Sequence, residues 1–397
     1  MKGTKKVLFV VLAALLLIAP ISTGAFGCAG GPSVSEWSIP NISITTGPGA
    51  AFGLDAAWGV DRAVTEINQA GGIEGKPVKI TRYDTAYDPA KAVVAMTQVL
   101  GTNPLVIVGP MDDVSIDSSG DMAIKAGVAC MSSITTDSRP RFTPWVASLY
   151  PESDAYAAIG TQEWLKLNPD IKTIVIFYAP QASSHIRQMA AQEPVLAKLG
   201  IKVLAKIECT VGQIDFGPQA VKAIALKPDG YYSHLNVEEE PRLCQALYQR
   251  GMTEGKRICC GAGATGADMF SLGKGFLEDT YLWDVYNFAS TDPGWLACVA
   301  AYKAEHSGGF PYSMAVWGQY EAVYAVKAAF ESLKITGDPS KLAQERLAIR
   351  DFLWNAKDVH GAQGSTWSWV NGVKTNPLFM YQIKNNECKL VSTVTMK

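Results

Sequence analysis

A chain of 397 residues with 48% hydrophobic residues is long enough for two domains of ordinary size, each with a buried core. Its formal net charge is −2, and charged residues make up 18% of the chain. This balance argues against nucleic-acid-binding proteins that use basic stripes, so no nucleic-acid partner is expected.

The N-terminus has the pattern of an export signal. Three lysines among the first six residues precede an apolar run at 7–21. At about 15 residues, this run is shorter than the roughly 20 that span a bilayer. We predict a signal peptide at 1–27. Its removal takes away three lysines and no acidic residue, so the net charge falls from −2 to −5.

Cys28 directly follows the predicted cleavage point. We predict lipoprotein-type cleavage with acylation of Cys28, and a flexible tether at 28–37. The alternative is plain secretion with an incidental Cys28. The predicted location is the periplasm or the outer face of the cell membrane. The lipid would anchor the protein there, since no second apolar run is long enough to span a bilayer.

Seven further cysteines and four histidines show no spacing typical of a metal site. The adjacent Cys259 and Cys260 lie in a predicted strand, where successive side chains point to opposite faces and cannot easily chelate one ion together. We expect Cys259 and Cys260 to be buried, unreactive thiols. No metal and no cofactor are expected, and any disulfide pairing is left open. The seven are Cys130, Cys209, Cys244, Cys259, Cys260, Cys298 and Cys388.

Strands and helices alternate through the first half of the chain. Apolar residues recur at helical spacing at 54–69, and Pro89 suits the first turn of a second helix. Repeated βα units predict a mostly parallel sheet covered on both faces. Strands are expected at 41–46, 78–83, 105–108, 128–131 and 145–149, and helices at 54–69, 89–100 and 118–126.

The pattern then restarts, which predicts a second lobe. Two α/β blocks and a late return of helices indicate two Rossmann-like lobes with parallel sheets, joined by three crossover segments near Pro151, Tyr286 and Asn371. We predict an N-terminal lobe at 38–151 plus 287–371 and a C-terminal lobe at 152–286 plus 372–397. Strands are expected at 173–178, 202–207, 230–234, 257–260, 281–285, 366–370, 378–383 and 389–394, and helices at 156–167, 186–199, 294–306, 314–333 and 340–355.

Two runs in the first lobe resemble a known family. The segment 67–78 (INQAGGIEGKPV) closes a helix with a double glycine and begins a strand, and 84–89 (DTAYDP) follows that strand. Together they resemble the extracytoplasmic solute-binding receptors of ABC importers, in the branch typified by the leucine/isoleucine/valine-binding protein. The resemblance implies a type I periplasmic binding protein fold. It also implies a monomeric, non-catalytic receptor that closes around a small molecule and delivers it to an ABC permease.

In such sheets, ligands bind outside the carboxyl ends of the strands. The resemblance implies that Phe52 covers the ligand and that Trp58 adds to this wall. Thr136 would hydrogen-bond the ligand, and Ile134 would offer its backbone carbonyl. The alternatives are a packing Phe52 and an ordinary Ser/Thr turn at 132–138.

Asp113 stands where amino-acid receptors of this family present a serine to the ligand carboxylate. Two facing carboxylates repel each other. Either the ligand has a cation or hydrogen-bond donor there, or Asp113 turns away as part of a helix N-cap with Asp112.

The second lobe departs further from amino-acid receptors. Ser183, Asn236 and Ala315 stand where the resemblance implies aromatic residues, and Gly263 stands where it implies the acid that holds an α-ammonium group. These changes would enlarge the pocket. We therefore expect an amino-acid-like, aromatic or amide-bearing ligand rather than a simple branched-chain amino acid.

Two rival hypotheses remain. The run 261–266 (GAGATG) matches GxGxxG, follows a predicted strand and opens a predicted helix, and Asp284 lies at a suitable distance for a ribose-binding acid. This would indicate a nicotinamide-dependent enzyme. The other rival is a ligand-sensing domain for a separate signalling partner.

The acidic run at 238–240 is expected to be a solvated helix start, with docking to a permease as its functional alternative.

Overall fold

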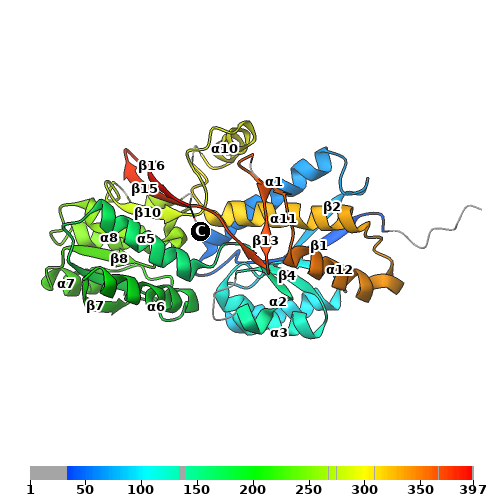
Figure 1. The fold of residues 1–397 in the computed structure, drawn as a ribbon, viewed down its shortest axis with the longest axis horizontal. Helices are drawn as coiled ribbons and strands as arrows, with labels where there is room; N and C mark the ends of the chain where they lie inside the picture. The colour runs from blue at the N-terminus through cyan, green and yellow to red at the C-terminus, as the bar shows by residue number, and fades with distance from the viewer. Residues whose placement is uncertain are drawn as a thin grey trace, which may run out of the picture.

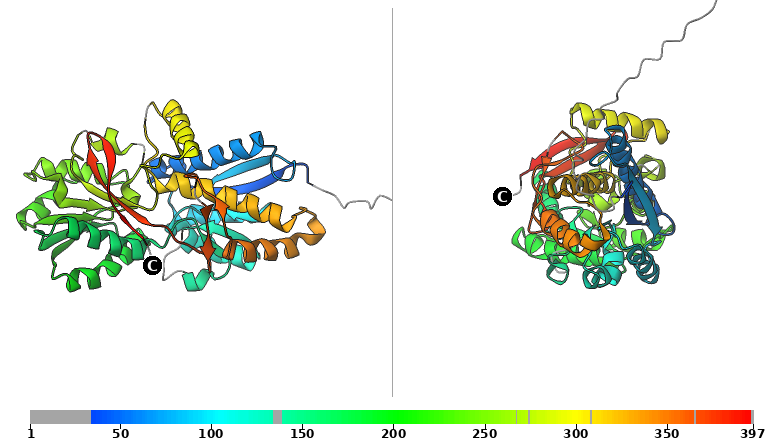
Figure 2. Two further views of the ribbon diagram at one scale, coloured as in Figure 1. Left: turned by 45° about the horizontal axis from the view of Figure 1, so that its top comes forward. Right: turned by 90° about the vertical axis from the view of Figure 1, so that its right-hand side faces the viewer.

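The computed structural model describes residues 34–133, 139–266, 268–273, 275–307, 309–364 and 366–395. They form two α/β lobes that lie side by side along the long axis of the molecule (Figure 1). The division between the lobes is also seen in the left view of Figure 2, which is turned by 45°. Within the described residues, no helix combines the length and apolar character needed to cross a bilayer.

The first lobe, blue, cyan and orange in Figure 1, contains a parallel five-stranded sheet of order β2-β1-β3-β4-β5. Helix α1 packs against α11, and α2 packs against α3. The strands are β1 (Trp37–Ser43), β2 (Val78–Asp84), β3 (Val106–Val108), β4 (Ala129–Ser132) and β5 (Val146–Ser148). The helices are α1 (Ala50–Gln69), α2 (Pro89–Gly101), α3 (Asp113–Lys125), α4 (Arg139–Phe142), α10 (Pro293–Glu305), α11 (Met314–Leu333) and α12 (Leu342–Trp354).

The second lobe, mainly green in Figure 1, contains a seven-stranded sheet of order β16-β15-β10-β9-β8-β6-β7. The strands are β6 (Thr173–Tyr178), β7 (Lys202–Glu208), β8 (Gly230–Ser233), β9 (Ile258–Cys260), β10 (Tyr281–Asp284), β15 (Leu378–Lys384) and β16 (Glu387–Val394). The helices are α5 (Ser153–Leu167), α6 (Ser183–Lys198), α7 (Gly217–Ala225), α8 (Glu240–Tyr248) and α9 (Met269–Gly273).

The predicted α/β fold of two lobes is confirmed, but the second sheet is not wholly parallel. β15 runs antiparallel to both β10 and β16. The two residues between β15 and β16, Asn385 and Asn386, both have positive φ, of 53° and 58°. A two-residue turn of this kind joins adjacent antiparallel strands, so the chain ends in a hairpin rather than in further βα units.

Side-chain caps begin several of the long helices. The cap residues of α2, α3, α10 and α11 each accept a hydrogen bond from a backbone N–H of the first turn: Asp88, Asp112, Asp292 and Ser313. The residues before α1 and α6, Gly49 and Ala182, provide no side-chain cap. The first-turn N–H groups of α1 and α6 are therefore available to acceptors from elsewhere.

The chain passes between the lobes three times, after β5, after β10, and after the small hairpin of β13 (Trp369–Val370) and β14 (Val373–Lys374). Another short pair, β11 (Val359–His360) and β12 (Thr366–Trp367), precedes that hairpin. Asn376 joins two of the crossings, because its Nδ2 donates to the carbonyl of Val285 at 2.9 Å and its backbone N–H donates to Tyr156 Oη at 2.9 Å.

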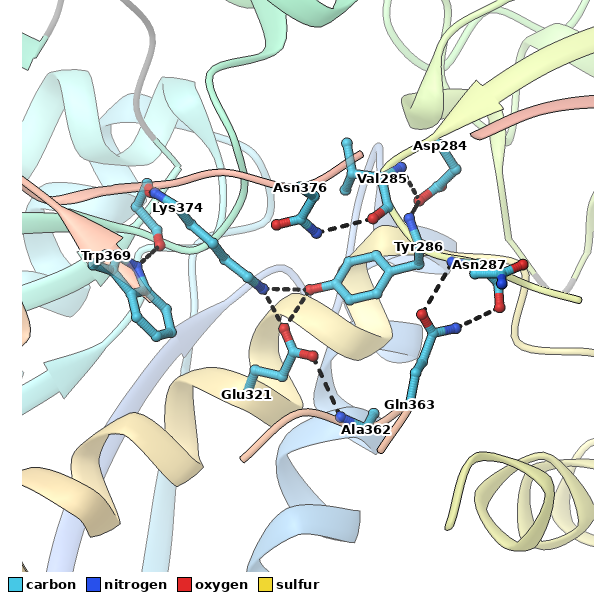
Figure 3. A network of polar contacts seen from close by, with 11 residues as sticks. Asp284, Val285, Tyr286, Asn287, Glu321, Ala362, Gln363, Trp369, Lys374 and Asn376 are labelled. Atoms are coloured by element: carbon cyan, nitrogen blue, oxygen red, sulfur yellow. Dashed lines mark hydrogen bonds and ion pairs between the residues drawn. The ribbon is translucent and has the colours of Figure 1, made fainter. Parts of the chain in front are cut away.

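A buried ion pair lies where these segments meet (Figure 3). Lys374 forms a salt bridge with Glu321 of α11, and neither side chain has any exposed surface. The Tyr286 hydroxyl donates to Glu321 Oε2 at 2.7 Å, and Lys374 Nζ lies 2.7 Å from the same hydroxyl. Lys374 Nζ also lies 4.4 Å from the ring centre of Trp367. The cation is thus held by a carboxylate, a hydroxyl and an aromatic face.

The cysteines of the described residues, 130 to 388, are all buried and unpaired, which confirms the expectation of buried thiols. Burial raises the pKa of Cys130 and of Cys209 to about 12. At neutral pH these groups remain protonated and are poor nucleophiles.

Candidate interlobe binding site

A cavity of about 90 Å³ lies between the lobes, at the carboxyl ends of strands from both sheets. Both lobes and the first crossing supply its walls. The first lobe contributes Ile44, Phe52, Tyr87, Met111, Asp112, Asp113 and Ser133, among others. The second lobe contributes Ser153, Ser184, His185, Gln188, His234, Asn236 and Gly263, among others, and the first crossing contributes Tyr150 and Pro151.

The start of α1 carries Phe52 to the cavity. A Cβ atom on Gly53 would lie 1.6 Å from the carbonyl oxygen of Ile44, so glycine is needed where α1 meets the end of β1. Phe52 lines the cavity at its predicted position. Trp58 does not line it. Its ring packs against Tyr302 with centres 4.8 Å apart, and its Nε1 donates to Glu305 Oε2 at 2.7 Å.

Asp113 lines the cavity, but it is occupied in joining the two lobes. Its Oδ2 accepts a hydrogen bond from the backbone N–H of Ser184 at 2.6 Å and one from the Ser183 hydroxyl at 3.0 Å. The Tyr87 hydroxyl lies 3.4 Å from its Oδ1. Asp113 therefore caps α6 of the opposite lobe. Ser183 belongs to this contact and to one with Asp117, and does not line the cavity.

Asp112 is the neighbouring carboxylate, and it has an unsatisfied oxygen. Its Oδ1 accepts from the backbone N–H of Ser115 at 2.8 Å and so caps α3. Its Oδ2 is buried and makes no hydrogen bond within the described residues. Burial, with the nearby charge of Asp113, raises the pKa of Asp112 to about 7.

Two buried histidines face the cavity from the second lobe. His185 Nδ1 accepts from the backbone N–H of Ala179 at 3.2 Å, which places the proton of the neutral ring on Nε2. The ring nitrogens of His234 lie 2.9 Å from the side-chain oxygens of Gln188 and Gln192. Burial lowers the pKa of His185 and lowers the pKa of His234 well below its usual value. Both rings are therefore neutral at pH 7.

The neutral ring of His234 has a single N–H, and its two ring nitrogens face the side-chain amides of Gln188 and Gln192. Gln192 Nε2 donates to the Thr161 hydroxyl at 2.6 Å, so its oxygen accepts from His234 Nε2. Gln188 must then turn its amide nitrogen toward Nδ1. Sequence reasoning missed both histidines. Their signal is that His185 lies in the first turn of α6, the helix that follows β6, and that His234 directly follows β8.

The other predicted positions of the second lobe have mixed outcomes. Asn236 and Gly263 line the cavity, and a Cβ atom on Gly263 would lie 3.1 Å from Asn236 Oδ1. Ala315 is buried and does not line the cavity, whereas its neighbour Met314 does. Ile134 and Thr136 lie outside the described residues.

The structure contradicts the dinucleotide hypothesis. The run 261–266 forms only a short 3-10 turn at Ala262–Ala264, and the next helix is the five-residue α9. Asp284 is fully buried. Its Oδ1 accepts from the backbone N–H groups of Val285 and Tyr286, and its Oδ2 accepts from the Thr265 hydroxyl. This carboxylate holds the second crossing together and is not placed to bind a ribose.

The expectation of a solvated acidic run at 238–240 is wrong. Glu239 and Glu240 are each 1% exposed. Glu239 accepts from the backbone N–H groups of Gly212 at 2.6 Å and Asn236 at 3.0 Å. Glu238 accepts from the backbone N–H of Ala51 in the other lobe at 3.0 Å. Gly212 and Ala51 are distant in the sequence, so Glu239 and Glu238 bind backbone donors of other segments.

The sequence profile of the periplasmic binding protein family matches residues 36–388. The Leu/Ile/Val-binding protein homolog 3 of Brucella melitensis is 25% identical over 348 residues, covering 87% of this chain and 90% of the relative. The Leu/Ile/Val-binding protein of Escherichia coli K12 is 23% identical, covering 84% of this chain and 91% of the relative.

Solved structures give the same fold. The branched-chain amino acid transporter substrate-binding protein LivJ of Streptococcus pneumoniae, in complex with isoleucine, has a TM-score of 0.78 at 20% identity. The match covers 90% of this chain and 99% of LivJ. A solute-binding protein of an ABC transporter from Rhodopseudomonas palustris BisB5, in complex with 3,4-dihydroxybenzoic acid, has a TM-score of 0.79 at 15% identity, over 91% and 98% of the two chains.

Proposed function

Because the chain belongs to the periplasmic binding protein family, we propose that it captures a small solute outside the cytoplasm and delivers it to an ABC permease. One observation carries this proposal. One cavity is walled by both lobes at the ends of their strands, and the described part of the chain crosses between those lobes three times. Such a site closes around its ligand by hinge motion. The family and the relatives named above are binding proteins, in agreement with the prediction of a non-catalytic receptor.

The ligand is an amino-acid-like, aromatic or amide-bearing compound rather than a simple branched-chain amino acid. Phe52, Tyr87 and Tyr150 offer aromatic surface, while Asn236, Gln188 and the two histidines offer donors and acceptors. Gly263 has no side chain with which to hold an α-ammonium group. Solved structures with this fold are in complex with isoleucine in one case and with a hydroxylated benzoic acid in another. Both amino-acid and aromatic ligands are therefore compatible with the fold.

The mature protein acts as a monomer held at the membrane by a lipid on Cys28. This part rests on the sequence pattern of residues 1–28. Mass spectrometry of the membrane fraction should find a diacylglyceryl group on Cys28. A soluble mature chain with an unmodified Cys28 would refute the anchor and leave the receptor function standing.

A thermal-shift screen of the purified chain tests the receptor function. A ligand at 100 times its dissociation constant adds about 2.7 kcal/mol, which raises the melting temperature by several degrees. The panel contains amino acids, aromatic acids, amides and amines. Gly263→Phe should fill the cavity and abolish the shift. Gly101→Phe is its control, because a Cβ atom on Gly101 meets no heavy atom within 4 Å. If no compound of any class binds, or if Gly263→Phe binds normally, the proposal fails.

A further inference from the structure

Asp112 lines the cavity, and one of its two carboxylate oxygens is satisfied by no described residue. The residue is 6% exposed and lines the cavity, and its Oδ2 is buried without a hydrogen bond to the described part of the chain. A buried oxygen of this kind carries a desolvation cost of about 1–3 kcal/mol or more until it finds a partner. Resting on the proposed receptor function, we propose that the ligand carries a cationic nitrogen that binds Oδ2 of Asp112.

Asp113, the residue that sequence reasoning singled out, is a weaker candidate for this role. Its Oδ2 already accepts from Ser183 and Ser184, and the Tyr87 hydroxyl faces its Oδ1. A ligand cation at Asp113 would have to compete with the N-terminus of α6. At Asp112, the hydrogen bonds come from the backbone and side chain of Ser115, and Oδ2 has no partner among the described residues. The geometry therefore moves the charge-selecting role from Asp113 to its neighbour.

The surroundings of Asp112 contain no compensating positive side chain. Among the described residues that line the cavity, none is Lys or Arg. His185 and His234 are neutral because burial lowers the pKa of each. Burial and the charges of Asp113, Asp112 and Glu239 raise the pKa of Tyr87 well above its usual value. The cavity therefore favours a positive ligand group over a carboxylate.

The apolar side chains that line the cavity indicate the rest of the ligand, beyond its cationic nitrogen. Phe52, Tyr87 and Tyr150 provide aromatic surface, and Met111 and Met314 provide flexible thioether chains. Aromatic faces attract both apolar bodies and adjacent cations. The ligand class is therefore a primary or substituted amine with an apolar or aromatic body.

The backbone before Asp112 is held in place. Gly109 has a φ of 111°, and a Cβ atom there would lie 2.3 Å from the carbonyl oxygen of Ile42. Its N–H donates to the carbonyl of Met131 at 2.7 Å. The loop thus crosses close to β1 and is bonded to the end of β4, so Asp112 is positioned before a ligand arrives. Such preorganisation reduces the entropic cost of binding.

Three probes of similar body separate charge from shape: 2-phenylethylamine, 2-phenylethanol and 3-phenylpropionate. Isothermal titration calorimetry of the full chain at pH 7.5 should give the amine an affinity at least about tenfold above that of the alcohol, with the anion weakest. This comparison uses only the unaltered protein, so it does not depend on the folding of a variant.

The variant Asp112→Asn keeps the Oδ1 acceptor that caps α3 and removes the charge. It should reduce amine affinity at least about tenfold and leave the affinity for the alcohol within about threefold. Asp88→Asn is the matched control, because Asp88 caps α2 in the same way, accepting from Lys91 N at 2.9 Å, but does not line the cavity. It should leave all three affinities unchanged.

The outcomes separate this inference from the receptor function. If the alcohol or the anion binds as tightly as the amine, or if Asp112→Asn binds the amine normally, the cation assignment is wrong and the receptor function stands. If none of the three probes binds and no compound of the thermal-shift panel binds either, the cation assignment and the receptor function both fail.

Discussion

The backbone N–H of Ser184, in the first turn of α6, donates a hydrogen bond of 2.6 Å to Oδ2 of Asp113 in the opposite lobe. A second contact runs in the other direction. The backbone N–H of Ala51, in the first turn of α1, donates a 3.0 Å bond to Oε1 of Glu238 in the second lobe. Because neither α1 nor α6 has a side-chain cap of its own, each lobe caps a helix of the other. Opening the cleft would return both helix ends to water, so these bonds favour the closed form.

Glu238→Ala should therefore weaken ligand binding although Glu238 does not line the cavity. Loss of a helix-terminal carboxylate costs about 1–2 kcal/mol, which corresponds to an affinity loss of about 5- to 30-fold. Calorimetry measures the affinity, and small-angle X-ray scattering should show a larger radius of gyration at equal ligand saturation. Asp88→Ala removes a cap within one lobe, so it should lower the melting temperature and leave affinity unchanged. Equal affinities for Glu238→Ala and the unaltered chain would show that the contact does not drive closure.

The sequence predicts the bounds of a helix or strand well where a local periodic pattern of apolar residues determines them. The strand at Thr173–Tyr178 and the helix at Met314–Leu333 have the bounds that the pattern predicts, since their apolar spacing and flanking residues suffice. The pairing of β15 with β10 was not predictable in this way. It depends on which strands become neighbours after the third crossing.

The site was predictable to the level of its loops. Phe52, Asp113, Asn236 and Gly263 do lie at the cavity, because strand ends in parallel sheets converge there. Which side chain of a loop points inward depends on tertiary contacts. Asp113 turns to α6, whereas Asp112 has the unsatisfied oxygen. Tertiary contacts also decide the acidic run at 238–240, where Glu239 binds the backbone N–H of Gly212 and Glu238 that of Ala51.

Lys374→Met should destabilise the protein strongly. The substitution leaves the Glu321 carboxylate buried with the Tyr286 hydroxyl and the N–H of Ala362 as donors but without its cation. Removing one partner of a buried ion pair typically costs about 3–5 kcal/mol. Urea denaturation should show this as a lower midpoint. Exposed Lys79→Met, whose ion pair with Glu36 lies at the surface, is the control and should change stability by less than about 1 kcal/mol. If both variants unfold at the same urea concentration, the pair at the crossings contributes little to stability.

The double variant Lys374→Met with Glu321→Gln extends this test. Removing both charges avoids the isolated buried carboxylate, so the double variant should regain part of the stability lost by Lys374→Met alone. An additive further loss would show that the two residues stabilise the fold independently.

The stability of the ligand-free protein should fall as the pH rises from 5 to 7.5. Burial, with the charge of Asp113, raises the pKa of Asp112 to about 7 from an ordinary value near 3.8. Burial likewise raises the pKa of Glu240 and of Asp284 to about 7. Through these three carboxyl groups the folded state binds more protons than the unfolded state between pH 4 and 7, and their stabilisation is lost as the pH rises through 7. The buried, neutral His185 and His234 oppose this trend in part below about pH 6.5, because they bind protons only once the chain unfolds.

Asp112→Asn should flatten this pH dependence in part, because Glu240 and Asp284 continue to titrate. The charged or titratable groups that influence Asp112 across the cavity are Asp113, Tyr87 and Tyr150, and both tyrosines stay protonated over this range because their pKa values are raised. Thermal melts of both proteins at half-unit steps measure the effect. A melting temperature that rises steadily from pH 5 to 7.5 in both the unaltered protein and Asp112→Asn would contradict the predicted loss of stability.

The cysteines of the described chain should not react with a thiol reagent while the protein is folded. Each is buried, and burial raises the pKa of Cys298 to about 11 and that of Cys259 and Cys260 well above the usual value. A thiolate must form and become accessible before it can react. A Cys28→Ser chain treated with a chromogenic disulfide should release no colour until urea unfolds it, and then show all seven remaining thiols. A thiol that reacts within seconds under native conditions would identify a local opening that this fold does not predict, and labelling followed by peptide mass spectrometry would locate it.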